Sequence, residues 1–288
     1  MNQQAPYKPK HKVRIVTAAS LFDGHDASIN IIRRLLQSRG AELIHLGHNR
    51  SAEEIVEAAI QEDVKALALS SYQGGHMEFF KYIKELLTEK GCPHVKIFGG
   101  GGGVISPSER QELETMGIGK IYSPEDGQKL GLDGIIGDLL KRCEGPKESK
   151  EVPKGSLVLE QAKLCTLIED ELNFSSLQKE IAKRCSPRKN LVIGLTGTGG
   201  AGKSSLLDEL LLRFLHDFKS IKIAVFCVDP SKKKTGGALL GDRIRINSCQ
   251  DKRIFLRSFA SRQSGRELSQ TSKDLVDSFK DFDYDLIF

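Results

Sequence analysis

The alternation of short apolar runs with longer amphipathic stretches in residues 12–143 is the feature that most constrains the fold. Five runs have the length and composition of buried strands: residues 13–17, 42–46, 66–70, 95–98 and 120–122. The stretches between them have helical periodicity. Five β-α units of this length predict an α/β domain with a parallel sheet covered on both faces, in a flavodoxin-like (Rossmann-type) layout.

Capping residues place the beginnings of two of the intervening helices. Ser51 is followed three residues later by Glu54, which is a capping-box pattern. Ser106 precedes Pro107 and Glu109, a combination of a second capping box with proline at the first helical position. These signals predict helices, rather than long loops, between the strands.

A second α/β pattern begins near residue 188. Its expected elements are strands at 191–195, 221–228 and 253–259 and helices at 203–218 and near 268–279. Another buried strand begins at 285–288, and because a domain rarely stops in mid-strand, we expect the chain to be a fragment. The predicted organisation is a first domain over 10–145, a largely helical linker over 146–187 and the first part of a P-loop domain over 188–288.

The glycine-rich segment from Gly197 to Ser204 matches G-x-x-x-x-G-K-S and lies between an apolar strand and an amphipathic helix. Lys203 would reach the β- and γ-phosphates of a nucleotide, and Ser204 would ligate Mg²⁺. A glycine-rich turn without a ligand is the alternative, but Lys-Ser at the start of a helix has no packing purpose. The backbone amides expected to surround the phosphates are those of Gly199, Gly200, Ala201 and Gly202.

Three charged residues follow the phosphate-binding loop. Asp229 ends the next predicted strand, and Asp242 and Arg245 lie in the loop beyond it. A carboxylate there can act on Mg²⁺ or its waters, and an arginine can bind phosphate. Each aspartate or arginine here, taken alone, is more often a surface charge than a ligand, and only its position after a phosphate-binding loop makes the two readings about even. Nothing in them distinguishes GTP from ATP, because the elements that read the γ-phosphate and guanine would follow Phe288.

A second candidate site lies at the carboxyl edge of the first sheet. Asp23 and His25 directly follow the first predicted strand, Ser70 ends the third, and Gly99 and Gly100 end the fourth. Ligands of open α/β sheets bind at this edge. A metal-binding imidazole needs its other ring nitrogen anchored, and a carboxylate two residues away can anchor it. The serine and the paired glycines would leave a narrow slot. A lone loop histidine is more often not a ligand, so the spacing carries this prediction.

These residues resemble the cobalamin-binding domain of the base-off, histidine-on enzymes, which include methylmalonyl-CoA mutase, glutamate mutase and methionine synthase. The family pattern is D-x-H-x-x-G, then S-x-L, then G-G, at spacings close to those found here. In this chain 41 residues separate Ser28 from Ser70, and 26 separate Tyr72 from Gly99. Ser28 replaces the glycine of the pattern and Tyr72 replaces its leucine.

The resemblance implies roles for the residues that match. His25 displaces the benzimidazole base of the cofactor and ligates cobalt, and Asp23 hydrogen-bonds the imidazole. The freed nucleotide tail lies between the strands beside Ser70, Gly99 and Gly100. The two departures affect the walls of the slot rather than the cobalt ligand.

The second half, with GLTGTGGAGKSSLLDELL, CVDPS and GGALLGDRIR, resembles the GTPase chaperones of cobalamin-dependent acyl-CoA mutases. The two domains in this order resemble the fused isobutyryl-CoA mutase family. That resemblance implies that residues 199–204 and Arg245 bind GTP and that Ser204, Asp229 and Asp242 serve Mg²⁺.

The same resemblance implies the activity of the complete protein. It is an adenosylcobalamin-dependent radical isomerase that interconverts isobutyryl-CoA and n-butyryl-CoA, with a GTPase that gates cofactor loading and protects the mutase. The acyl-CoA would bind a C-terminal barrel that this chain lacks, and the full-length protein would be a homodimer. We therefore expect the chain alone not to isomerise an acyl-CoA.

Composition excludes several other classes of function. The net charge is only +5, and the basic run at residues 232–234 reads as a solvated loop without a nucleic-acid motif. The polar start lacks the apolar core of a signal peptide, and no apolar run approaches the ~18 residues that span a bilayer. The six cysteines form no C-x-x-C pair. We expect a cytoplasmic protein with neither a nucleic acid nor a membrane as partner.

Two other functions fit the same motifs. One is a stand-alone cobalamin carrier or sensor with an attached nucleotide switch, which a barrel encoded downstream would argue against. The other is a P-loop ATPase whose first domain is an empty flavodoxin-like module, which histidine ligation of added cobalamin would argue against.

Overall fold

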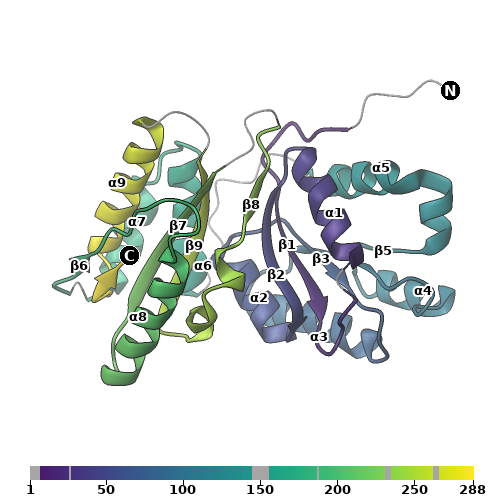
Figure 1. The fold of residues 1–288 in the computed structure, drawn as a ribbon, viewed down its shortest axis with the longest axis horizontal. Coiled ribbons are helices and arrows are strands. Elements are labelled where there is room, and N and C mark those ends of the chain that lie inside the picture. Colours follow the sequence, from purple (N-terminus) through teal and green to yellow (C-terminus); the bar gives the residue numbers. More distant parts are fainter. Residues whose placement is uncertain (1–6, 26, 145–155, 187, 231–234, 262–265) are drawn as a thin grey trace. The chain divides into compact units, whose positions relative to one another are not determined.

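The structure is a computed structural model that describes residues 7–25, 27–144, 156–186, 188–230, 235–261 and 266–288. The chain divides into two compact units (Figure 1). The first comprises Met1–Ile60, Val64–Lys150 and Ser231–Leu239, and the second Gln61–Asp63, Glu151–Pro230 and Leu240–Phe288. Residues 146–155 and 187 of the predicted linker, residue 145 before it and the basic run 232–234 lie outside the described residues.

The first unit is built on a parallel sheet whose strand order confirms the flavodoxin-like prediction. The order is β5-β4-β3-β1-β2, and each neighbouring pair among these strands is parallel. The sequence did not predict a sixth strand, β8, which extends the sheet beyond β2. The strands are β1 (Arg14–Ser20), β2 (Glu42–Arg50), β3 (Ala66–Ser70), β4 (Lys96–Gly100), β5 (Lys120–Tyr122) and β8 (Ala238–Leu240).

Helices connect these strands and cover the sheet. Both predicted capping boxes are present: Ser51 and Glu54 exchange backbone-to-side-chain hydrogen bonds before α2, as do Ser106 and Glu109 before α4. On one face, α1 and α5 pack against the sheet in a single apolar cluster. The helices are α1 (Ala27–Ser38), α2 (Ala52–Gln61), α3 (His76–Glu89), α4 (Pro107–Thr115) and α5 (Pro124–Cys143), the last interrupted at Gly131.

The second unit has its own parallel sheet, in the order β6-β10-β7-β9. The strand predicted at 285–288 is present as β10 (Leu286–Ile287), inserted between β6 and β7. The strand predicted at 191–195 is shorter than expected, although the Ile193 N–H still donates to the Ile287 carbonyl at 2.8 Å. The other strands are β6 (Leu191–Val192), β7 (Ile223–Pro230) and β9 (Ile254–Ser261).

Alternate strand residues of the second sheet enter two different apolar clusters. Phe255 and Ile287 pack with α6, α7 and α9, while Leu256 and Leu286 pack with α8. The sheet is therefore covered on both faces, as a parallel sheet requires. The helices are α6 (Leu157–Glu169), α7 (Ser175–Arg184), α8 (Lys203–Asp217) and α9 (Arg266–Lys280), and two 3₁₀ turns are η1 (Asp242–Ile244) and η2 (Asn247–Gln250).

Two further findings concern the described residues alone. None of their helices has the length and apolar content needed to cross a bilayer. The six cysteines all lie within them and form no disulfide.

Candidate functional site

The Asp23 carboxylate organises the loop that follows β1. Its side chain is 1% exposed and accepts hydrogen bonds through both oxygens. Oδ1 accepts from the His25 backbone N–H and from His25 Nδ1, each at 2.9 Å, and Oδ2 accepts from the Tyr72 backbone N–H at 2.6 Å. Burial opposes the charge, but the hydrogen bonds from Tyr72 and His25 hold the pKa of Asp23 below its usual value.

This hydrogen-bonding pattern leaves one nitrogen of His25 available to a metal. The contact of Nδ1 with the Asp23 carboxylate favours the tautomer in which Nδ1 carries the proton and Nε2 carries the lone pair. The His25 side chain is 70% exposed, so this lone pair is accessible from solvent. The loop therefore presents an anchored imidazole whose Nε2 is the nitrogen available to a metal.

A largely apolar cavity of about 400 Å³ lies at the same carboxyl edge of the first sheet. Its walls come from α1, from the ends of β3 and β4, and from α5. Ser70, Gly99 and Gly100 all line it, so the structure brings these predicted residues together. The Ser70 Oγ is buried and has no hydrogen-bond partner among the described residues. Because buried polar atoms are normally hydrogen-bonded, this hydroxyl is suited to bind a polar group of a ligand. We call this cavity the tail slot.

Glycines shape the tail slot, but for different reasons. A Cβ at Gly99 would lie 2.5 Å from the ring of Phe80, so this glycine is required by the core beneath the slot. A Cβ at Gly101 would collide with the Ser71 carbonyl oxygen, because the chain segments after β3 and β4 touch there. Sequence reasoning missed Gly101, and the run of five glycines at 99–103 was the available signal.

The phosphate-binding loop of the second unit has the geometry that its glycines predict. Gly200 and Gly202 have φ angles of 80° and 82°, which favour glycine, and Gly202 caps α8. The Lys203 ammonium donates to the carbonyls of Gly197 and Thr198 at 2.8 and 2.9 Å. The lysine thus extends back over its own loop, toward the place where phosphates bind in such loops.

The three predicted Mg²⁺ residues lie together beside this loop. The Ser204 hydroxyl donates to Asp242 Oδ1 at 3.2 Å, and the Gly241 N–H donates to Asp229 Oδ2 at 3.1 Å. Burial and the neighbouring Asp242 carboxylate raise the pKa of Asp229 to about 6. A cation at this position would relieve the repulsion between the two carboxylates.

The described residues contain no group of three or more His, Cys, Asp or Glu side chains that could hold a metal ion. The donors beside the phosphate-binding loop are one hydroxyl and two carboxylates. This set suits Mg²⁺, which keeps several waters and binds through one or two carboxylates plus substrate phosphates.

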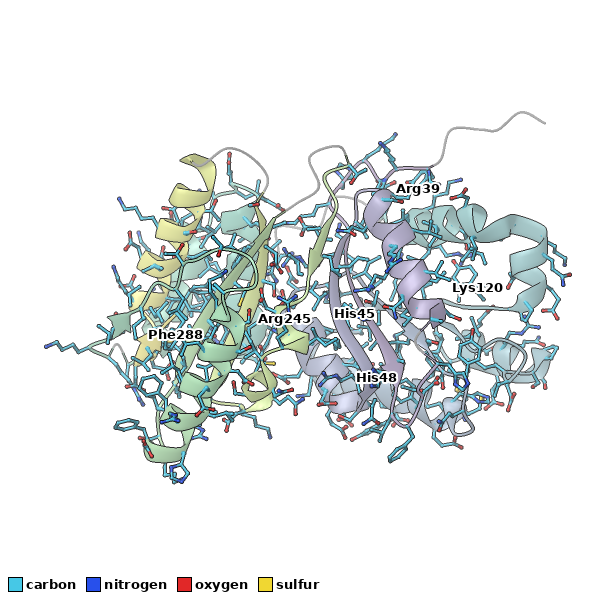
Figure 2. All side chains as sticks on the ribbon, viewed as in Figure 1. Arg39, His45, His48, Lys120, Arg245 and Phe288 are labelled. Atoms are coloured by element: carbon cyan, nitrogen blue, oxygen red, sulfur yellow. The ribbon has the colours of Figure 1, made fainter. Side chains whose placement is uncertain are left out.

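The two arginines after Asp242 differ in their surroundings. Arg243 is buried, and its Nε donates to Glu62 Oε1 of the same unit at 2.7 Å, so it is committed to the protein interior. Arg245 is exposed at the end of η1 (Figure 2), and it acts electrostatically on Asp229. Of this pair, Arg245 is the exposed residue, and its contact with a phosphate stays a prediction.

Comparison with known proteins finds a family match within each half of the chain. Residues 13–122 match the B12 binding domain, and residues 161–288 match the methylmalonyl-CoA mutase-associated GTPase MeaB. The first range contains Asp23, His25 and the Ser70, Gly99 and Gly100 wall of the tail slot, and the second contains the phosphate-binding loop.

Relatives in several bacteria resemble nearly the whole chain. It is 54% identical to a fused isobutyryl-CoA mutase of Geobacillus kaustophilus (strain HTA426) and 51% identical to one of Cupriavidus metallidurans (strain ATCC 43123 / DSM 2839 / NBRC 102507 / CH34), over 98% and 97% of the chain. It is 45% identical to a third, of Nocardia farcinica (strain IFM 10152), over 98%. The chain spans only 26–27% of the length of these relatives. The chain joins a match to a B12-binding domain to a match to a MeaB-type GTPase domain, and over nearly its whole length it is similar to part of the fused isobutyryl-CoA mutases.

Proposed function

We propose that this chain is the cofactor-handling portion of an acyl-CoA mutase, which binds adenosylcobalamin in its first unit and Mg²⁺-GTP in its second. The observation that carries the proposal is the buried Asp23 carboxylate, which holds His25 through Nδ1 next to Tyr72, a residue that lines the tail slot. The matches to the B12-binding and MeaB families support it from both halves of the chain.

The residues of the first unit fit a cobalamin whose own base has been displaced. His25 would hold cobalt through Nε2, and Asp23 would fix the ring and strengthen the nitrogen as a ligand. The tail slot would take the nucleotide tail, with the Ser70 hydroxyl as a hydrogen-bonding partner for one of its polar atoms. When bound, adenosylcobalamin supplies the radical chemistry of a carbon-skeleton rearrangement.

The second unit would bind GTP through the amides of residues 199–202 and through Lys203. Ser204, Asp229 and Asp242 would hold Mg²⁺ or its waters, and Arg245 would contact a phosphate. Binding would replace the interactions that Lys203 makes with its own loop carbonyls. We assign to this unit the gating of cofactor loading and the protection of the mutase.

The complete protein would interconvert isobutyryl-CoA and n-butyryl-CoA in the cytoplasm. Its acyl-CoA would bind in a barrel outside these 288 residues, and two copies would form a homodimer. These assignments rest on the similarity to fused isobutyryl-CoA mutases and on the finding that the chain spans only 26–27% of their length.

Titration of the chain with hydroxocobalamin tests the cobalamin assignment. We expect the visible spectrum to change as an imidazole replaces the benzimidazole base on cobalt, and His25→Ala to abolish the change. His94→Ala is the matched control, because His94 is exposed just before β4, at the opposite edge of the sheet. An unchanged spectrum with the unsubstituted chain would instead favour an empty flavodoxin-like module.

A further inference from the structure

Tyr72 touches three segments that surround the tail slot. Its backbone N–H donates to Asp23 Oδ2, the carboxylate that also holds His25. Its phenol shares a hydrogen bond of 2.7 Å with the hydroxyl of Ser28, in the first turn of α1. Its ring lies 5.4 Å from the imidazole of His25, centroid to centroid, at an angle of 36°. Tyr72 thus connects the loop after β1 that carries Asp23 and His25 (the histidine loop), the start of α1 and the wall of the slot.

The position of this ring is fixed from its other side by a glycine. A Cβ at Gly102 would lie 2.8 Å from Tyr72 Cε1, so the ring occupies space that only glycine leaves open. Gly102 also has a φ of 59°, in the region that favours glycine. Tyr72 is therefore held between the glycine segment after β4 and the histidine loop.

Ser28 and Tyr72 are also the two positions at which the chain departs from the cobalamin-binding pattern. A glycine has no hydroxyl and a leucine cannot donate or accept, so the pattern residues cannot form the bond that joins these two. Both side chains line the tail slot. The two departures therefore form one structural unit rather than two separate changes of the slot wall.

We propose that Tyr72, braced by Ser28, is a positioning residue that holds the His25 imidazole and the start of α1 in the arrangement that receives cobalamin. The inference rests on the proposed function, since it concerns how His25 comes to ligate cobalt. The ring limits the directions that the exposed imidazole can take, and the phenol keeps α1 at a fixed distance from the end of β3. Preorganisation of this kind favours binding because less freedom is lost when the ligand enters.

Three variants test the hydrogen bond between Tyr72 and Ser28. Tyr72→Phe removes the hydrogen bond but keeps the ring, Ser28→Ala removes the same bond from its other end, and the double variant removes nothing more. We expect each single variant to weaken hydroxocobalamin binding about fivefold, which is the effect of losing one ordinary hydrogen bond. The double variant should weaken binding by the same factor, because it removes the same bond. Matched controls are Tyr82→Phe, which loses a phenol bond to Glu53, and Ser38→Ala, at the far end of α1.

Tyr72→Leu installs the residue of the pattern and removes the ring as well. We expect this variant still to bind cobalamin in the tail slot, but with His25 ligating cobalt in only a fraction of the bound molecules. Electron paramagnetic resonance of the cob(II)alamin form, with ¹⁵N-labelled histidine, reports which nitrogen ligates cobalt, and full histidine ligation should persist in Tyr72→Phe. Loss of stability alone would not produce this difference between Phe and Leu.

The outcomes distinguish the inference from the function on which it rests. If the unsubstituted chain shows no histidine nitrogen on cobalt, the proposed function fails. If it does show one, the role of the Tyr72–Ser28 hydrogen bond is refuted when either single variant binds cobalamin as tightly as the parent or more tightly. It is also refuted when the effects of the two single variants add in the double variant. Complete histidine ligation in Tyr72→Leu would refute the role of the ring.

Discussion

Asp229 lies partly buried at the end of β7, beside the carboxylate of Asp242. Its pKa is raised to about 6 by burial and by Asp242, whereas an aspartate in an unfolded chain titrates near 3.9. Between about pH 4 and pH 6 the folded chain therefore holds more protons than the unfolded chain, so this group lowers the free energy of unfolding as the pH rises. Above about pH 6 the loss is complete.

Asp229→Asn should for this reason stabilise the second unit while impairing its ligand site. We expect the free energy of unfolding at pH 8, without Mg²⁺, to rise by about 1 kcal/mol, with the difference vanishing near pH 4. The same variant should lose most of the Mg²⁺-dependent stabilisation by GTP. In the parent, Mg²⁺ offsets the repulsion between Asp229 and Asp242, and in the variant this repulsion is already absent. Urea denaturation at both pH values measures the first effect, and melting temperature with Mg²⁺-GTP measures the second.

The control for this experiment is Asp277→Asn, an exposed carboxylate of α9 paired with Lys280. A surface pair of this kind contributes little, so the variant should leave both the pH dependence and the nucleotide effect unchanged. If Asp229→Asn is instead less stable than the parent at pH 8, the two carboxylates do not repel each other as the structure indicates.

Among the elements, those defined by local signals could be predicted from the sequence. β3 and β5 have the predicted bounds, and the capping boxes before α2 and α4 place both helix starts. β8 could not be predicted, because its neighbour in the sheet, β2, is far away in the sequence. The break of α5 at Gly131, with φ 66° and ψ 171°, also escaped, since an isolated glycine does not necessarily end a helix.

The candidate sites divide in the same way. The convergence of His25, Ser70 and Gly99 follows from the rule that parallel strands end at one edge, so strand order alone predicts it. The bond between Ser28 and Tyr72 depends on how α1 lies against the sheet, which no local pattern encodes. Which of Arg243 and Arg245 stays exposed depends likewise on a partner, Glu62, far away in the sequence.

The contact between the segments after β3 and β4 yields a prediction for the tail slot. Gly101→Ala places a methyl group against the Ser71 carbonyl, so one segment must move. We expect it to lower the free energy of unfolding of the first unit by about 2 kcal/mol, as overpacking does, and to weaken hydroxocobalamin binding at least tenfold. Gly103→Ala is the matched control, because a Cβ there meets nothing within 4 Å.

These two substitutions lie two residues apart in one glycine run, so a general loss of chain flexibility would affect both. Equal effects of Gly101→Ala and Gly103→Ala on cobalamin affinity would contradict a role for the close contact with Ser71. Unfolding followed by circular dichroism and cobalamin titration by visible absorbance provide the two measurements.

At the scale of the whole molecule, each unit has a parallel sheet of its own and a candidate site at the ends of its strands. The residues proposed to bind cobalamin all belong to the first unit, and those proposed to bind the nucleotide all belong to the second. Each site can therefore be tested by a substitution in one unit, with the other site as an internal control. His25→Ala should leave GTP binding unchanged for this reason.

The chain should bind the cofactor without performing the rearrangement. It spans 26–27% of the length of its relatives, and the His25 side chain is 70% exposed, so the described residues do not enclose the proposed cobalt ligand. Radical rearrangements require a closed site that excludes side reactions, and an acyl-CoA must be positioned within it. We expect no conversion of isobutyryl-CoA to n-butyryl-CoA by the 288 residues with adenosylcobalamin and Mg²⁺-GTP, as measured by mass spectrometry. Turnover that His25→Ala abolishes would show that these two units alone suffice.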